Sequence, residues 1–236
     1  MSGAFERVPY EQWAASLRWL QGEHMVLVGP TGCGKTTVMR NLLRRRRHVI
    51  LFATKTKDRS LDPYIREEGY TRIADYNQAP YHLNKFILWP PAKGTLRETA
   101  ANQQAKMRAA LDLIFNEGGW TVGADELHYM CSRLRLTEEV ETYSHQGRSS
   151  GLTLVSGMQR PAWVPLITFS SATHALLWKT TEPADLKRLS GLARTDIREV
   201  AAEMNRLGKH DFIGIDTRDE NARPVITSFP RPGTAA

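Results

Sequence analysis

Apolar residues along this chain fall into two patterns: short unbroken runs, and positions that recur every three or four residues. The unbroken runs predict buried strands at residues 24–28, 48–53, 85–89, 120–124, 152–156, 175–178 and 212–215. The helical spacing predicts helices at residues 10–20, 37–43, 107–115, 138–145 and 197–204. Because strands alternate with helices, we expect an α/β fold in which helices cover both faces of a mainly parallel sheet.

Two segments depart from this pattern. Residues 54–85 are polar and carry Pro63 and Pro80, so we expect them to be an irregular insertion on the core. Their mixture of basic residues and tyrosines suits contacts with nucleic acid, and it equally suits an ordinary surface loop. The tail at 223–236 contains three prolines and is expected to be partly disordered. The chain has 236 residues, enough for one large core, and we expect residues 1–222 to form a single domain.

Basic residues are in excess. Lys and Arg total 32 against 25 for Asp and Glu, which gives a net charge of +7. This surplus favours an anionic partner, and nucleic acid is the obvious candidate. The alternative interpretation is a mildly basic enzyme whose charge serves its nucleotide and its solubility.

The cysteines and the apolar runs bear on where the protein works. Cys33 and Cys131 give neither a disulfide framework nor a metal-binding spacing, which favours a reducing compartment. The first residues lack the apolar segment of a secretory signal, and no apolar run approaches the length of a bilayer span. We therefore expect a soluble, cytoplasmic protein that does not insert into a membrane itself.

The end of the first predicted strand carries a complete phosphate-loop (Walker A) pattern, G-x-x-x-x-G-K-[ST]. The matching residues are Gly29, Pro30, Thr31, Gly32, Cys33, Gly34, Lys35 and Thr36, followed by Thr37 in the next helix. Backbone N–H groups of such a loop cradle phosphates, Lys35 reaches the β- and γ-phosphates, and the Thr36 hydroxyl binds Mg²⁺. The strand before and the helix after complete the expected context. The pattern predicts that the chain binds a nucleoside triphosphate, with ATP and Mg²⁺ as cofactors.

Two carboxylates follow the predicted strand at 120–124. Asp125 stands where such folds need a Mg²⁺ ligand, and Glu126 is placed to polarise an attacking water. Adjacent carboxylates repel a triphosphate unless metal is present, so the pair suits hydrolysis. A kinase gains nothing from an activated water, whereas an ATPase that drives mechanical work does. The alternative interpretation is that both residues simply lie at a solvent-exposed strand end and have no catalytic role.

Three further polar residues flank the strand at 152–156. Gln159 follows it and is a candidate sensor of the γ-phosphate, with a turn-forming polar residue as the alternative. Arg148 precedes it, and its guanidinium is a candidate to stabilise the transition state on a neighbouring subunit. A plain surface arginine is the alternative for Arg148, in which case Arg160 becomes the candidate.

Together these motifs resemble the FtsK/HerA superfamily of ring-forming P-loop ATPases. The matching residues are Gly29–Thr37, Val122–Glu126, Gly147–Leu152 and Gln159–Pro161, so the resemblance spans residues 25–161. It implies a RecA-like (ASCE) core, a homo-oligomeric ring with active sites between subunits, and ATP-driven movement of double-stranded DNA. It also implies that Arg148 is the finger acting in trans and that Gln159 is the sensor.

The small size and the absence of a recognisable DNA-reading domain make the chain look more like a viral genome-packaging motor than a chromosome pump. We therefore expect a motor that packages a phage genome into a capsid, with duplex DNA, its own copies and a capsid portal as partners. Two other classes stay open. One is a small phosphotransferase, and the other is a nucleotide-gated phage assembly or export ATPase that is indifferent to DNA.

Overall fold

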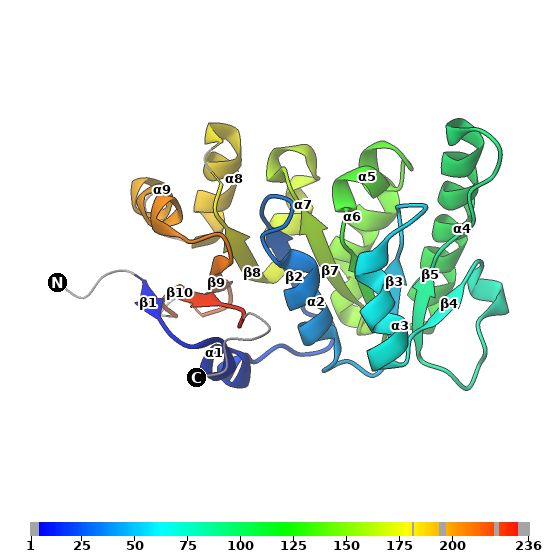
Figure 1. Cartoon of the computed structure of the whole chain (residues 1–236), viewed down its shortest axis with the longest axis horizontal. Helices are drawn as coiled ribbons and strands as arrows, with labels where there is room; N and C mark the ends of the chain where they lie inside the picture. The colour runs from blue at the N-terminus through cyan, green and yellow to red at the C-terminus, as the bar shows by residue number, and fades with distance from the viewer. Residues whose placement is uncertain (1–4, 181, 194–196, 220–221, 231–236) are drawn as a thin grey trace.

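A mainly parallel sheet runs through the centre of the molecule (Figure 1). The computed structural model describes residues 5–180, 182–193, 197–219 and 222–230, and within these ranges the sheet has ten strands in the order β1-β10-β9-β8-β2-β7-β6-β3-β5-β4. The strands are β1 (Glu6–Arg7), β2 (His24–Val28), β3 (Val49–Phe52), β4 (Thr71–Ile73), β5 (Lys85–Leu88), β6 (Thr121–Ala124), β7 (Thr153–Met158), β8 (Ala172–Trp178), β9 (Asp211–Asp216) and β10 (Val225–Ser228). All strands from β8 to β4 are parallel, and β9 is antiparallel to both of its neighbours.

Helices cover both faces of this sheet, as predicted. One face carries α1 (Tyr10–Ser16), α2 (Lys35–Leu43) and α3 (Asp62–Glu68). The other carries α4 (Leu96–Glu117), α5 (Leu127–Ser132), α6 (Thr137–Gln146), α7 (Leu166–Ser170), α8 (Pro183–Ala193) and α9 (Ile197–Arg206). The two layers stand on either side of the sheet in Figure 1. The predicted α/β fold is therefore confirmed.

The central strands are largely apolar because both of their faces are buried. In β2, Met25 and Leu27 pack with the α1–α3 layer, whereas Val26 and Val28 pack with the opposite layer. Successive side chains of a strand point to opposite faces, so a strand covered on both sides reads as a continuous apolar run. This is why all seven predicted strands are found.

Strand order brings three strand ends together. Because β7 pairs with β2 on one side and with β6 on the other, the carboxyl ends of β2, β7 and β6 lie next to one another. The strand before Gln159, β7, thus lies beside the strand before Asp125, β6. Ligands of open parallel sheets bind at this edge.

The segment at 54–85 is more regular than predicted. Its Pro63 lies in the first turn of α3, where proline is well tolerated, and β4 adds a strand to the sheet. Tyr64, Tyr70 and Tyr76 are buried in the core, so they are not available to stack on nucleic-acid bases.

The tail also contains a strand that its proline-rich sequence did not predict. Residues Val225–Ser228 form β10, which pairs with β9 and β1 and buries Ile226. The tail expected to be partly disordered thus contains one ordered strand, while residues 231–236 lie outside the described ranges. At the other end of the chain, helix α1 ends at Ser16, short of the predicted end at residue 20, and Leu20 is 65% exposed. In the described part of the chain, no helix is both long enough and apolar enough to cross a bilayer.

Candidate active site

The phosphate loop leads from β2 into α2 at the carboxyl edge of the sheet (Figure 1). Gly32 and Gly34 have φ angles of 75° and 110°, values that residues with a Cβ rarely adopt. Gly34 caps α2, so the first N–H groups of that helix face the loop. The local sequence thus builds an anion-binding helix start.

Lys35 places a positive charge inside this loop. Its side chain is buried, with the residue only 7% exposed, and its Nζ donates hydrogen bonds to the carbonyl oxygens of Gly29 (2.7 Å) and Pro30 (2.9 Å). Both acceptors belong to the phosphate loop itself, so the loop holds the ammonium group against its own backbone. A charge in this position complements the partial positive charge of the α2 N-terminus in attracting phosphate.

Thr36 and Asp125 form the metal-binding candidate pair. Thr36 Oγ1 donates to Asp125 Oδ2 at 2.7 Å, which joins the start of α2 to the end of β6. The other carboxylate oxygen, Asp125 Oδ1, is buried and has no hydrogen-bond partner. On Gly157 of β7, a Cβ would lie 2.8 Å from that oxygen, so the glycine leaves it room.

These donors fit Mg²⁺. A hydroxyl and an unpartnered carboxylate oxygen are hard ligands, and Mg²⁺ is commonly held by one or two protein groups together with phosphates and water. The described residues contain no cluster of three or more His, Cys, Asp or Glu side chains able to hold a metal. An ion held here would complete its coordination with phosphate oxygens and water.

Glu126 lies beside Gln159, as the parallel pairing of β6 and β7 requires. Gln159 Nε2 donates to Glu126 Oε1 at 3.2 Å. The same carboxylate oxygen is 3.8 Å from Lys55 Nζ, a contact that sequence reasoning missed because Lys55 follows a different strand, β3. Burial disfavours the charge on Lys55, but nearby carboxylates, led by Asp58, outweigh it and raise the pKa of Lys55. Lys55 therefore remains charged at neutral pH and places a positive charge close to Glu126.

Arg148 lies at the amino-terminal ends of the strands, opposite the carboxyl ends that carry the phosphate loop. It is exposed in the 3₁₀-helix η3 (Gly147–Ser150), just before β7, and its carbonyl packs against Gly22 just before β2. The six residues of β7 span about 20 Å, which exceeds the reach of an arginine side chain. Arg148 cannot reach the phosphate loop of its own chain.

Arg160 lies at the carboxyl edge, but other groups hold its guanidinium. Its Nε is 2.9 Å from Oδ2 of Asp185, a residue that is 0% exposed, and its Nη2 is 3.5 Å from Glu182. The Arg160 guanidinium also lies over the Trp163 ring, 4.9 Å from its centroid. These contacts within the chain make Arg160 the weaker candidate for a finger acting on another subunit.

A cavity of about 470 Å³ adjoins the phosphate loop. One wall is the loop with the first turns of α2, and the other is formed by His210, Phe229 and Pro230. The last three residues come from the C-terminal part of the chain, and sequence reasoning missed them because no motif marks them. Cys33, inside the loop, is a buried free thiol whose pKa is raised by burial.

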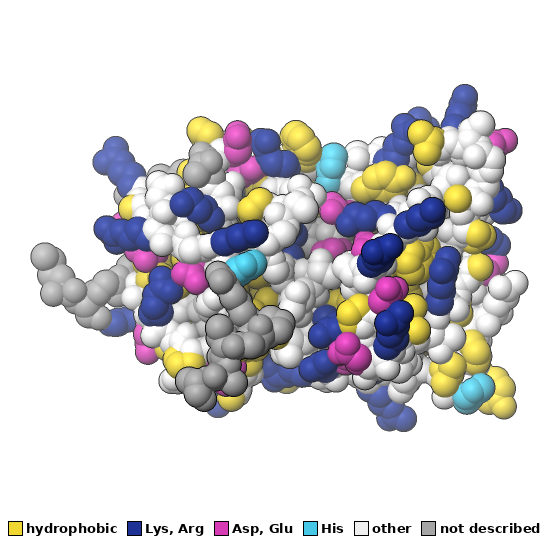
Figure 2. All heavy atoms as spheres, viewed as in Figure 1, with side chains coloured by type: hydrophobic (Ala, Val, Ile, Leu, Met, Phe, Trp, Pro, Cys, Tyr) yellow, Lys and Arg dark blue, Asp and Glu magenta, His cyan; other side chains and the backbone are white. Residues whose placement is uncertain are grey.

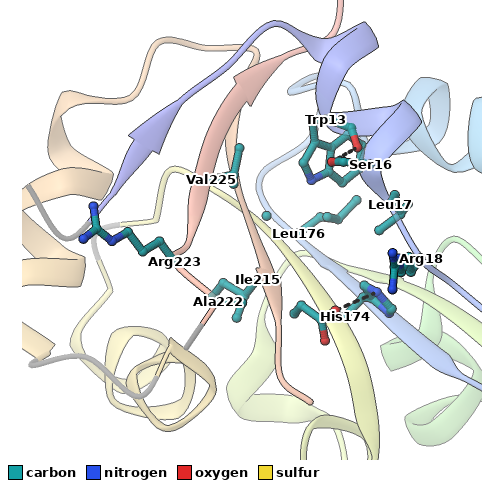
Figure 3. A pocket seen from close by; sticks show the side chains of 12 residues that line it. Trp13, Ser16, Leu17, Arg18, His174, Leu176, Ile215, Ala222, Arg223 and Val225 are labelled. Atoms are coloured by element: carbon teal, nitrogen blue, oxygen red, sulfur yellow. Dashed lines mark hydrogen bonds and ion pairs between the residues drawn. The ribbon is translucent and has the colours of Figure 1, made fainter. Parts of the chain in front are cut away.

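A second, smaller hollow of about 180 Å³ lies away from the loop, between α1 and strands β8 to β10 (Figure 3). Trp13 and Leu17 line it on one side, and His174 and Ile215 line it on the other. Burial lowers the pKa of His174 to about 4, so the ring is neutral at physiological pH. No phosphate-loop residue lines this hollow, and we assign it no part in the chemistry.

No protein-family model matches the sequence, and no curated protein matches it. Solved structures match it in fold. The genome packaging NTPase B204 from Sulfolobus turreted icosahedral virus 2, in complex with ATP-gammaS, matches with a TM-score of 0.62 and 17% identity over 88% of this chain and 97% of its own. B204 from Sulfolobus turreted icosahedral virus, a DNA-packaging ATPase, matches with a TM-score of 0.61 and 18% identity over 91% of this chain and 100% of its own.

The chain has the fold of a viral genome-packaging NTPase. This confirms the predicted RecA-like P-loop core. The similar structures are viral packaging ATPases, the class of protein that the sequence motifs resemble. The cytoplasmic domain of the type VII secretion ATPase EccC from Thermomonospora curvata is also similar, with a TM-score of 0.53 and 13% identity. That match covers 92% of this chain but only 26% of the EccC chain.

Proposed function

We propose that this protein is a Mg²⁺-dependent ATPase that forms a homo-oligomeric ring and moves double-stranded DNA. The observation that carries the proposal is the meeting of four groups beside one phosphate loop. Thr36 touches Asp125 there, and Glu126 touches Gln159. The similarity in fold to packaging NTPases, one of them in complex with ATP-gammaS, supports the same conclusion.

Each group has a distinct task in hydrolysis. Lys35 and the loop N–H groups hold the β- and γ-phosphates, while Thr36 and Asp125 hold Mg²⁺, which when bound neutralises phosphate charge. Glu126 accepts a proton from the attacking water. Gln159 senses the γ-phosphate, and its direct contact with Glu126 supports this role.

The anionic partner is duplex DNA. The chain carries a net charge of +7, and Lys and Arg side chains are spread widely over the face shown in Figure 2, many of them over the region of α3 and α4. Such a surface attracts a polyanion without reading its sequence. We propose that the cargo is a phage genome entering a capsid through a portal, in the cytoplasm of the host.

The position of Arg148 supports the proposed ring. A guanidinium at the edge opposite its own phosphate loop can serve catalysis only on a neighbouring copy, where it stabilises the charge on the γ-phosphate. This role requires that the edge bearing η3 of one subunit faces the phosphate loop of the next.

Mixing two inactive variants tests this arrangement. We expect Arg148→Ala and Lys35→Ala to be inactive alone and to recover part of the hydrolysis rate when mixed, because one interface then pairs an intact loop with an intact arginine. The measurement is the ATPase rate across mixing ratios, with mixed assembly verified by mass. Arg160→Ala is the matched comparison: it keeps both the loop and Arg148, so it should hydrolyse ATP on its own without complementation. An absence of recovery in rings shown to be mixed would contradict action in trans.

A further inference from the structure

The cavity beside the phosphate loop extends beyond the part that phosphates occupy. Phosphates of a bound nucleotide lie within the loop, against its N–H groups and Lys35. The cavity continues along the first turns of α2 to Phe229 and Pro230, which form an apolar wall. Its volume of about 470 Å³ lies in the range of small-molecule sites. A polar end followed by an apolar wall matches the two halves of a nucleotide.

The ring of Phe229 packs against the ring of Tyr10. The two rings meet edge-on, with centroids 4.6 Å apart and an interplanar angle of 68°. Tyr10 is itself buried, and its hydroxyl donates a 2.8 Å hydrogen bond to Asn41 of α2. Phe229 is thereby tied to the helix that begins at the phosphate loop, although the two are far apart in sequence. A pre-positioned aromatic ring costs little conformational entropy when a flat ligand packs on it.

His210 supplies the polar group of the same wall. It lies between α9 and β9, and its Nδ1 is 3.1 Å from the carbonyl oxygen of Cys33 in the loop. Because a carbonyl oxygen only accepts hydrogen bonds, Nδ1 carries the proton when the ring is neutral. Nε2 is then an acceptor, suited to a hydroxyl or amino group of a ligand.

We propose that this cavity binds the nucleoside part of ATP, with the base packed against Phe229 and with His210 as its polar contact. The inference rests on the proposed function, because it assigns the other half of the same nucleotide. It gives strand β10 a functional role, since this strand carries the chain to Phe229.

Inorganic tripolyphosphate separates the two halves of the site, because it has the phosphates of ATP and no nucleoside. We expect Phe229→Ala to weaken ATP binding by about tenfold, the scale of one lost base–aromatic contact, and to leave tripolyphosphate binding unchanged. Phe229→Tyr should retain ATP affinity because it keeps the ring. Dissociation constants of both ligands, measured by calorimetry on the full chain, provide the readout.

Two other variants keep the result interpretable. Tyr81→Ala removes a 99% exposed aromatic ring outside the cavity and should change neither affinity. Should Phe229→Ala fail to fold, His210→Ala must show the same selective loss of ATP. Equal weakening of both ligands, or no weakening of either, would overturn the nucleoside assignment while leaving the phosphate site intact. Failure of the unmodified protein to bind either ligand would instead overturn the proposed function, and this inference with it.

Discussion

The Lys35→Ala variant is expected to lose ATP turnover by about three orders of magnitude, the scale on which removing a buried, hydrogen-bonded charge acts. The ammonium is buried in the loop and is held by two of its carbonyl oxygens. No other lysine or arginine in the described part of the chain donates a hydrogen bond to the loop carbonyls. ATP affinity should fall with the rate, because the charge binds ground-state phosphates as well.

Lys57→Ala is the matched control, since Lys57 is an exposed lysine on the loop after β3 and should leave basal turnover unchanged. Thermal unfolding of both variants checks that the loop substitution has not destabilised the fold. Full turnover by a well-folded Lys35→Ala protein would reject the phosphate site and every role assigned around it.

Glu126→Gln is expected to separate binding from chemistry. Replacing the carboxylate by an amide removes the proton acceptor but retains size and hydrogen-bonding capacity, so hydrolysis should fall by about two to four orders of magnitude. ATP affinity should stay the same or rise slightly, because a negative charge near the phosphates has been removed. Single-turnover hydrolysis and equilibrium ATP binding, measured on the same preparation, distinguish the two effects.

The contact between Gln159 and Glu126 indicates that Glu126→Gln will change the chemistry with little change in local structure. Gln159 donates to the oxygen that the substitution retains, so the loop after β7 should keep its position. Glu11→Gln, an exposed carboxylate in the first turn of α1, is the matched control and should behave as the unmodified protein. Normal hydrolysis by Glu126→Gln would exclude Glu126 as the base.

Sequence periodicity predicted the elements that are buried on both faces. Strands β2, β7 and β8 are buried at every position and carry apolar residues on both faces. Edge elements carry no such signal. Strand β4, at one edge, buries only Ile73, and β10, next to the edge strand β1, is flanked by prolines, so these short strands were interpreted as loop and tail.

The site was predictable where a local motif exists. The phosphate loop and the Asp125–Glu126 pair follow predicted strands, so their convergence at one edge follows from parallel order alone. The contacts of Lys55, His210 and Phe229 join segments distant in sequence, and only the folded chain reveals them. The position of Arg148 at the far edge also depends on the fold, since sequence order alone leaves its distance from the loop undetermined.

The most direct test of the motor is the ATPase rate with and without duplex DNA, measured on a species whose mass is determined in the same solution. Shared active sites and a moving duplex predict a large oligomer whose hydrolysis is strongly stimulated by duplex DNA. An assembly or export ATPase would hydrolyse ATP at the same rate with or without DNA, and a phosphotransferase would require a second substrate. A protein that stays monomeric at every concentration, with nucleotide and duplex present, and whose rate ignores DNA would contradict the proposal.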